Sequence, residues 1–298
     1  MTERSFKFAT CDVFTDRRFG GNPLAVLPDA RGLSDEQMQL IAREFNFSET
    51  TFVLPPDDPR NTARVRIFTP VRELPFAGHP TVGTAFVLAT LGTIARETRD
   101  IVFEEGVGPV PVRIERAGER VTRCTLTVAQ LPKQPAAAAP SREALASMLS
   151  LEQKDVLEGA ECWSCGLPFL VVPVADLAAL ARCVPNDAIV RRALADYATQ
   201  ALYPVAREAA ETWRVRSFVP HQTIVEDPAT GSAAAAFAGW LAGRAPRGES
   251  TLRYRLNQGV EMGRPSELAL DIDRAGGQVS AVRVGGAAVI VTEGSMQV

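Results

Sequence analysis

The chain has 298 residues, of which 46% are hydrophobic and 22% charged, and its formal net charge is −3. This length accommodates two domains of roughly 150 residues, and the composition is typical of globular proteins. The near-neutral charge balance argues against nucleic acid or an anionic membrane surface as a partner.

Targeting and membrane segments are not visible in the sequence. Residues 1–10 contain Glu3, Arg4 and Lys7 and no apolar core, so they do not resemble a secretory signal. The longest apolar run, residues 233–243, is too short to cross a bilayer. Five cysteines in such a chain indicate reduced thiols and a cytoplasmic location.

The first half of the chain alternates between strand and helix patterns. Residues 6–14 have the pattern of an opening strand, and Ser34-Asp35-Glu36-Gln37 matches a capping box that predicts a helix to about Phe45. Residues 80–91 predict a second helix, with proline at its start and Gly92 at its end. Further strands are predicted where β-branched and aromatic residues gather, over residues 51–54, 64–68, 101–104, 110–115 and 121–128.

The second half has a similar order of elements after a proline- and alanine-rich stretch, residues 132–140, which is the best linker candidate. Two domains are therefore predicted, 1–130 and 131–298, with the alternative that the last strands return to the first domain. The predicted elements are a strand over 169–173, a helix over 186–199, a strand over 214–218, a helix over 228–243 and short strands to residue 292.

One motif occurs twice, about half a chain length apart. Both copies follow V-R-x-F-x-P, a gap and then x-P-x-x-G-[ST]-A; they occupy residues 65–70 with 79–85, and residues 215–220 with 227–233. The residue before the shared proline is His79 in the first copy and Asp227 in the second. Duplicated halves that differ at one polar position suggest a site shared between them.

The two helices that follow these motifs lack a polar face. Residues 233–242 are apolar or glycine throughout, and residues 82–91 add only small threonines and Gly83. A helix that is apolar all round is buried on all sides. The sequence therefore predicts an α+β protein of two pseudo-symmetric domains, each a curved mixed sheet around a buried central helix.

The starts of these helices are candidate ligand sites. A helix N-terminus has unpaired N–H donors and a partial positive charge, so it readily binds an anion. If two related domains bring both starts to one cleft, that cleft suits a small carboxylate. The alternative interpretation is structural: Thr84, Ser232 and Asp227 would then cap or support their own helices.

Other chemistries find little support. Residues 227–232 lack the lysine of a phosphate-binding loop, and the two histidines, His79 and His221, form no ligand-spaced cluster, so we expect no cofactor and no metal. The lone C-x-x-C at residues 162–165 lacks a second pair. His79, beside the repeated motif, is placed for proton transfer, whereas position alone makes Glu49 a solvated carboxylate at a strand start.

Five blocks together resemble the phenazine-biosynthesis isomerase (PhzF-like) family, in the same order and over nearly the whole chain. They are residues 19–23, 46–50, 78–85, 226–233 and 258–266. The resemblance implies the diaminopimelate-epimerase fold, with two pseudo-symmetric domains and a site between them. Epimerases of that fold use one cysteine from each domain as acid and base. Here Asp227 stands at the position of the second cysteine and the first motif has none, which rules against a thiol pair.

The resemblance also implies roles for individual residues. Glu49 matches the single glutamate that takes a proton from one substrate carbon and returns it to another. His79 and Asp227 match its partners, and Ser232 matches a residue that contacts substrate. Other predicted substrate-binding positions lie in the matching blocks: Asn22, Gly78, Gly83, Thr230 and Gly231. The type reaction isomerises a dihydro-hydroxyanthranilate without a cofactor, and members are commonly homodimers.

We therefore expect an isomerase that moves a proton between carbons of a small, cyclic carboxylic acid. Two alternatives stay open. One is a member of the same fold that binds a metabolite or a protein without catalysis. The other is an epimerase or lyase that uses the same base on another acid.

Overall fold

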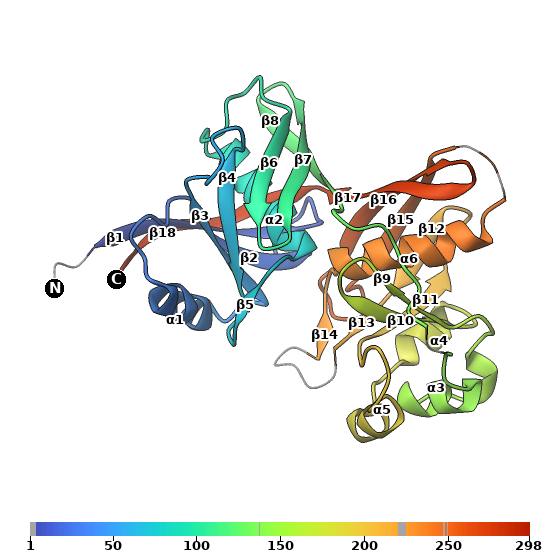
Figure 1. Ribbon diagram of the computed structural model, residues 1–298. Helices are drawn as coiled ribbons and strands as arrows, with labels where there is room; N and C mark the ends of the chain where they lie inside the picture. Colours follow the sequence, from blue (N-terminus) through green and yellow to red (C-terminus); the bar gives the residue numbers. More distant parts are fainter. Residues whose placement is uncertain (1–3, 137, 220–224, 247, 249) are drawn as a thin grey trace. The chain divides into compact units, whose positions relative to one another are not determined.

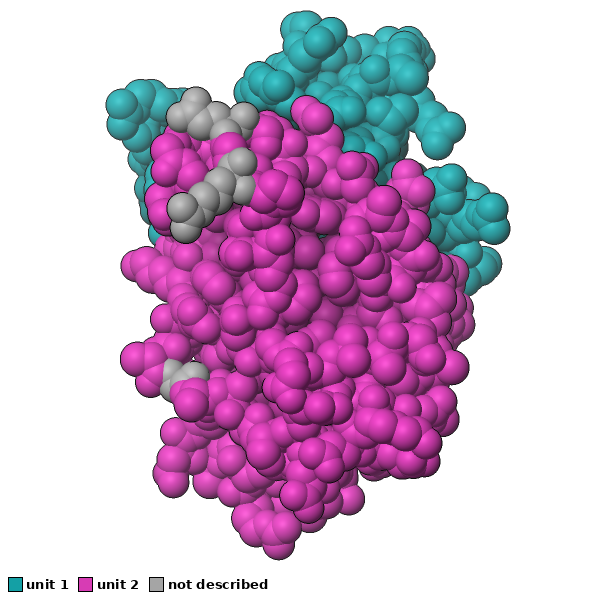
Figure 2. Space-filling model, turned by 90° about the vertical axis from the view of Figure 1, so that its right-hand side faces the viewer, with its two compact units in different colours: residues 1–129, 285–298 teal, residues 130–284 magenta. Residues whose placement is uncertain are grey.

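The computed structural model describes residues 4–136, 138–219, 225–246, 248 and 250–298. Pro220 of the second motif and His221 lie outside the described residues. The chain divides into two compact units, coloured separately in Figure 2: Met1–Ala129 with Gly285–Val298, and Gln130–Val284. The unit that begins the chain therefore also contains its last strand.

The first unit contains a mixed sheet. Its strands are β1 (Ser5–Val13), β2 (Asn22–Leu27), β3 (Glu49–Leu54), β4 (Ala63–Phe68), β5 (Glu73–Leu74), β6 (Asp100–Glu105), β7 (Gly108–Ala117), β8 (Arg120–Thr127) and β18 (Ala288–Gln297). The order across the sheet is β18, β1, β2, β3, β4, β6, β7, β8, with β5 added to the end of β4. The β2–β3 and β4–β6 pairs are parallel and the other pairs antiparallel. The last strand pairs with the whole of the first, from Ser5 opposite Gln297 to Val13 opposite Ala288.

Helix α2 (Gly78–Thr90) lies among these strands (Figure 1). It is buried from Gly78 to Ala89 and contacts β1, β2, β3, β7, β8 and β18. Small residues allow this close approach, because a Cβ atom at Gly83 would lie 2.5 Å from Cδ2 of Leu24 and 2.7 Å from Cγ2 of Val13. The sheet around a buried apolar helix that the sequence predicts is present in this unit.

Helix α1 (Asp35–Phe45) packs against the strands through an apolar cluster. It begins with the predicted capping box, in which Oγ of Ser34 accepts from the Gln37 N–H and the Gln37 side chain accepts from the Ser34 N–H. It ends at Asn46, whose φ of 51° is left-handed. The cluster joins the helix to β1–β4 and consists of Phe6, Leu27, Ala30, Leu33, Met38, Ile41, Ala42, Phe52 and Phe68.

The second unit has its own mixed sheet and a larger helical part. Its strands are β9 (Glu161–Ser164), β10 (Pro168–Pro173), β11 (Leu202–Arg207), β12 (Thr212–Val215), β13 (Ser217–Phe218), β14 (Glu226–Asp227), β15 (Leu252–Gln258), β16 (Ser266–Ala275) and β17 (Gln278–Gly286). Its helices are α3 (Arg142–Met148), the 3-10 turn η1 (Gln153–Asp155), α4 (Leu177–Arg182), α5 (Asp187–Ala193) and α6 (Gly231–Arg244). No helix among the described residues is both long and apolar enough to span a membrane.

Strand pairing in the second unit repeats that in the first. From β1 to β2, β3, β4, β6 and β7, the successive pairs are antiparallel, parallel, antiparallel, parallel and antiparallel. The same succession connects β9, β10, β11, β12, β15 and β16. The buried helix follows a short hairpin strand in both cases, α2 after β5 and α6 after β14. The repeated motif therefore corresponds to a repeated path of the chain.

Helix α6 is enclosed like α2. Its residues are buried from Ala233 to Leu241, and it contacts β9, β10 and β16. The rings of Phe237 and Trp240 stack with centroids 5.3 Å apart. A Cβ atom at Gly239 would lie 2.2 Å from Cε3 of Trp163 in β9, so β9 and α6 are in direct contact.

Both central helices begin at residues other than those predicted. Helix α2 starts before Pro80, which occupies the first turn, where a missing N–H removes no helical hydrogen bond. Helix α6 starts after Pro228, because hydrogen bonds with Gln258 hold the preceding loop out of the helix: Gln258 donates to the Asp227 carbonyl and accepts from the Thr230 N–H. The helix predicted over 186–199 is the shorter α5.

Candidate active site

Three polar residues predicted for the site lie together in the first unit. Asn22 begins β2, Glu49 begins β3 and His79 lies in the first turn of α2. The two strands are parallel neighbours, so their starts share one edge of the sheet. Nδ2 of Asn22 lies 3.2 Å from Nδ1 of His79, and the Ser48 hydroxyl donates to Oδ1 of Asn22 at 3.0 Å. Nε2 of His79 lies 3.5 Å from Oε2 of Glu49.

Burial decides the charge of His79. The residue is 4% exposed, and desolvation lowers its pKa to about 3, against a smaller opposing effect of a hydrogen bond to the backbone of Pro23. The imidazole is therefore neutral at neutral pH, and its contact with Glu49 is not an ion pair. A neutral imidazole has one nitrogen that donates and one that accepts. Glu49 thus lies beside a neutral imidazole and not a fixed positive charge.

The start of α2 has no side-chain cap. Its N-cap residue is Ala77. The hydroxyl oxygens of Thr84 and Thr51 are 2.8 Å apart, so Thr84 ties α2 to the strand that begins with Glu49. Thr84 therefore does not cap α2, but it supports the helix against β3, as the structural interpretation allows. Gly78 is buried at the helix start, and Gly83 has a packing role at the closest approach to β1 and β2.

The predicted residues of the second unit occupy one loop and helix start. Asp227 ends β14, Thr230 is the N-cap residue of α6, and Gly231 and Ser232 begin the helix. The Thr230 hydroxyl donates to Oδ2 of Asp227 at 2.5 Å and does not cap the helix. The two side chains therefore form one hydrogen-bonded unit in front of α6.

Two strand-end residues that were not predicted as site residues support these helix starts. Gln258 at the end of β15 bonds to the loop before α6, and Glu105 at the end of β6 lies 2.7 Å from the Thr81 hydroxyl in α2. Each is followed by Gly-Val, as Glu105-Gly106-Val107 and Gln258-Gly259-Val260. This short repeat is the signal that would have found them.

The arginine of the repeated V-R-x-F motif fixes the hairpin before each helix start. Arg66 donates twice to the Glu73 carboxylate, at 2.7 and 2.6 Å. Arg216 donates twice to the Glu226 carboxylate, both at 2.8 Å. Each guanidinium also lies over the phenylalanine of its own motif, at 5.1 Å for Phe68 and 4.6 Å for the second copy. The repeat therefore encodes the same hairpin clamp twice.

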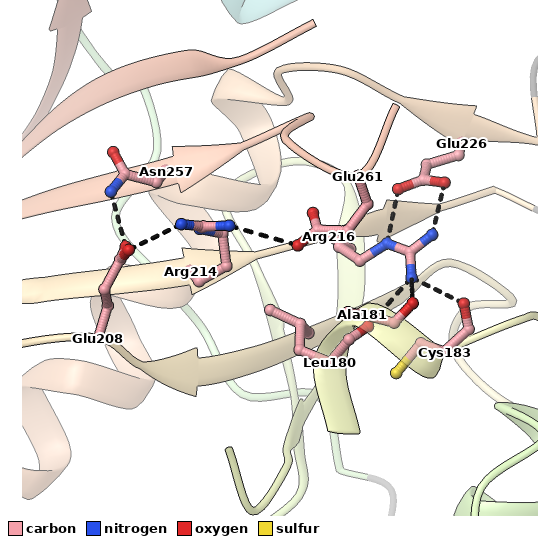
Figure 3. A network of polar contacts seen from close by, with 9 residues as sticks. All are labelled: Leu180, Ala181, Cys183, Glu208, Arg214, Arg216, Glu226, Asn257 and Glu261. Carbon is pink, nitrogen blue, oxygen red and sulfur yellow. Dashed lines mark hydrogen bonds and ion pairs between the residues drawn. The ribbon is translucent and has the colours of Figure 1, made fainter. Parts of the chain in front are cut away.

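The Arg216 clamp is the more enclosed of the two. Its side chain is 9% exposed, and Nη1 donates to backbone carbonyls at the end of α4, those of Leu180, Ala181 and Cys183 (Figure 3). Glu226 directly precedes Asp227 in β14. The clamp therefore fixes the strand that carries Asp227.

Cysteine and metal chemistry gain no support from the described residues. The cysteines are free and buried, and burial raises the pKa of Cys162 to about 11 and that of Cys165 to about 12. No group of three or more His, Cys, Asp or Glu side chains in the described part of the chain is arranged to hold a metal ion.

The structure thus brings together Asn22, Glu49 and His79 in the first unit. It brings together Asp227 and Thr230 in the second, beside the α6 start that contains Gly231 and Ser232. That the two groups form a single site stays a prediction.

Known proteins resemble the chain over nearly its full length. The family model described as phenazine biosynthesis-like protein matches residues 11–294. An uncharacterized isomerase of Mesorhizobium japonicum is 41% identical over 298 residues, 96% of each chain. The trans-2,3-dihydro-3-hydroxyanthranilate isomerase of Pseudomonas aeruginosa is 39% identical, over 97% of this chain and 98% of that protein. The crystal structure of a Bacillus anthracis phenazine biosynthesis protein of the PhzF family matches with a TM-score of 0.86 and 26% identity, over 99% of this chain and 100% of that one.

The sheet around a buried helix gives the α+β class, and the relatives named as isomerases show that the chain is an isomerase. Within that class, the chain belongs to the PhzF-type, phenazine biosynthesis-like family. The family resemblance of the five sequence blocks is confirmed, and so is the expectation of an isomerase.

Proposed function

We propose that this isomerase moves a proton between two carbons of a small, cyclic carboxylic acid, with Glu49 as general acid/base and no redox cofactor. The observation that carries the proposal is the 3.5 Å contact between Glu49 and a neutral, buried His79. A fixed positive charge at this distance would favour the ionised carboxylate and weaken it as a base. A neutral partner leaves Glu49 able to gain and lose a proton.

The proposed chemistry balances within the substrate. The Glu49 carboxylate takes a proton from one carbon, and the electron pair of the broken C–H bond enters the adjacent π system. The same carboxyl group then returns its proton to another carbon of that system. His79, beside Asn22, is proposed to form a hydrogen bond with Glu49 as the carboxyl group changes charge. No electrons enter or leave, so an oxidant or reductant is not required.

The carboxylate of the substrate is proposed to lie at the helix starts. The N-cap residues Ala77 and Thr230 make no side-chain cap to α2 or α6. Helix starts without such caps offer N–H donors and a partial positive charge to an anion. Ser232, in the first turn of α6, is the proposed side-chain contact to the substrate.

The first acid to test is trans-2,3-dihydro-3-hydroxyanthranilate, because the Pseudomonas aeruginosa relative is named for its isomerisation. The Mesorhizobium japonicum relative is named only as an isomerase and is slightly more similar. Other small cyclic acids therefore belong in the same screen.

The experiment follows turnover of these acids in deuterated water by NMR, for the wild type and for Glu49→Gln. The wild type should place deuterium on the carbon that gains the proton. Glu49→Gln should lower kcat at least about 10²-fold, the low end for a positioned acid/base, with thermal unfolding nearly unchanged. Glu44→Gln, an exposed glutamate of α1, is the matched control and should keep the wild-type rate.

Asp227→Asn should reduce the rate less than Glu49→Gln, because Asp227 is proposed to orient and not to carry the proton. Normal turnover by Glu49→Gln, together with an inactive Asp227→Asn, would transfer the role of base to Asp227. A wild-type protein that exchanges deuterium into no acid of the screen would contradict the proposed function.

A further inference from the structure

Gln258 is a fully buried polar side chain in front of α6 that the proposed reaction leaves unused. It ends β15 and is 0% exposed. Its Nε2 atom donates to the backbone oxygen of Asp227 at 2.8 Å and to Oγ1 of Thr230 at 2.9 Å. Its Oε1 atom accepts from the Thr230 N–H at 3.2 Å. All three hydrogen bonds thus go to the loop that carries Asp227.

The backbone partners fix which way the Gln258 amide points. A carbonyl only accepts and a backbone N–H only donates, so Nε2 must face Asp227 and Oε1 must face the Thr230 N–H. The second hydrogen of Nε2 then goes to Oγ1 of Thr230, which acts as an acceptor. The single hydroxyl hydrogen of Thr230 is left for Oδ2 of Asp227, 2.5 Å away. The hydrogen bonds therefore run in one direction, from Gln258 through Thr230 to Asp227.

We propose that Gln258 is a positioning residue, which acts through Thr230 to hold the Asp227 carboxylate in one orientation and in its ionised form. A hydroxyl that donates to a carboxylate favours the charged form of that carboxylate. Turning Thr230 away would leave one of the two buried Nε2 hydrogens of Gln258 without an acceptor, which costs more than the loss of an exposed hydrogen bond. The effect of Gln258 on catalysis rests on the proposed function, whereas its effect on Asp227 does not.

The surrounding chain keeps Gln258 in place. The Ser266 hydroxyl donates to the backbone oxygen of Pro228 at 2.8 Å. A Cβ atom at Gly259 would lie 2.6 Å from the same oxygen, and φ there is +72°. The residues after Gln258 are thus packed directly against the Asp227 loop.

The first test needs no substrate. In protein labelled with ¹³C at the aspartate carboxyl groups, the titration midpoint of Asp227 is compared between the wild type, Gln258→Met and Thr230→Val. Both variants should move the midpoint to higher pH by roughly one unit, since a hydrogen bond to a charged group is lost. Asn257→Leu is the matched control, because this neighbour in β15 donates instead to Glu208 (Figure 3). It should leave the midpoint unchanged.

An unmoved Asp227 midpoint in Gln258→Met and Thr230→Val would overturn the proposal. A shift in Gln258→Met without one in Thr230→Val would also overturn it, because the effect has to pass through the Thr230 hydroxyl. If Gln258→Met does not fold, Thr230→Val decides alone, since valine keeps the shape of threonine.

The second test uses an acid that the wild type converts. Gln258→Met and Thr230→Val should lower kcat about tenfold with little change in KM, and should move the acidic limb of the pH–kcat profile to higher pH. Thr230→Ser, which keeps the hydroxyl, should retain more of kcat than Thr230→Val. The positioning role of Gln258 would be overturned if both variants kept the wild-type kcat and pH–kcat profile while Asp227→Asn was impaired. That result would leave the proposed function standing. Full activity of Glu49→Gln would overturn the proposed function and the catalytic role of Gln258 with it.

Discussion

At the scale of single residues, Glu105 is a glutamate whose carboxyl group is buried and not solvated. Its side chain is buried in the first unit, with Oε1 2.7 Å from Oγ1 of Thr81. The Thr81 hydroxyl donates to Oε1 of Glu105, and the Ala77 carbonyl, 2.8 Å from the same hydroxyl, competes for its single hydrogen. Desolvation by burial raises the pKa of Glu105 to about 8, against a smaller opposing effect of Thr81. Glu105 is therefore protonated at neutral pH.

Glu105→Gln should make the free energy of unfolding less sensitive to alkaline pH. Between the ordinary pKa of 4.5 and the folded value of about 8, the folded chain keeps a proton that the unfolded chain releases. The stability from this group is therefore fully present below 4.5 and falls as pH rises toward 8. Thermal unfolding at about pH 5 and about pH 9 should show a larger loss for the wild type than for Glu105→Gln.

Glu104→Gln is the matched control for that comparison. Hydrogen bonds from Asn61 and from the N–H groups of Asp57 and Asp58 hold the pKa of Glu104 below its usual value. Glu104 is therefore ionised in both states throughout this pH range, and its replacement should leave the pH slope as in the wild type. Equal slopes for the wild type and both variants would contradict a protonated Glu105.

The sequence identifies Glu49 and His79 as candidates, but it does not give their electrostatic environment. The neutrality of His79 depends on burial among strands distant in sequence. Gln258 and Glu105 are single polar residues at strand ends, and their partners lie 24 to 31 positions away. A local pattern carries no information on such contacts, so only the Gly-Val repeat after them was available as a signal.

At the scale of elements, Gly239 and Gly243 of α6 have opposite surroundings. A Cβ atom at Gly239 would lie 2.2 Å from the indole of Trp163, whose Nε1 is held by Glu161 at 2.8 Å. A Cβ atom at Gly243 meets nothing within 4 Å. One glycine is therefore required for packing, whereas the other only lowers the helix propensity of α6.

Alanine at these two positions should change stability in opposite directions. Gly239→Ala should destabilise by about 1–3 kcal/mol through overpacking. Gly243→Ala should stabilise by at most about 0.5–1 kcal/mol, because Gly243 lies in the last turn and this gain is that of a helix interior. Urea unfolding of both variants measures the difference. Destabilisation of similar size in both would show that the contact of Gly239 with Trp163 is not the cause.

The starts of the central helices show where prediction from local pattern fails. A proline followed by small apolar residues predicts a helix start at Pro228, but α6 begins at Gly231. The competing interactions come from Gln258 and Ser266, which bond to the intervening loop from the following strands. Tertiary hydrogen bonds therefore override the local preference at the segment that carries Asp227.

At the scale of the whole molecule, the internal repeat and the apolar helices predict the α+β class and the helix inside each sheet. The apolar faces of α2 and α6 depend on their own sequences, which is why this part of the fold is predictable. The strand that pairs with β1 on the side away from β2 is not predictable, because the alternating pattern of a strand does not specify a neighbour. That neighbour is β18, at the opposite end of the chain.

This pairing predicts an order of folding for the two units. The second unit is continuous, Gln130–Val284, whereas the first needs β18 to complete its sheet. Joining chain ends costs more loop-closure entropy than joining near neighbours. In pulsed hydrogen exchange during refolding, amides of the β10–β11 pair should gain protection before those of the β1–β18 pair. Earlier protection of β1–β18 would contradict this order.

On the ribosome, the pairing of β1 with β18 delays completion of the first unit. The first unit emerges early, yet β18 follows only after the second unit has been translated, on the order of ten seconds later at typical elongation rates. Until then one side of β1 has no strand beside it, and the surface of α2 that contacts β18 lacks its cover. An open strand edge and an apolar helix are features that chaperones bind and that promote aggregation. The nascent first unit therefore passes through an interval in which β1 and α2 stay exposed until β18 has been synthesised.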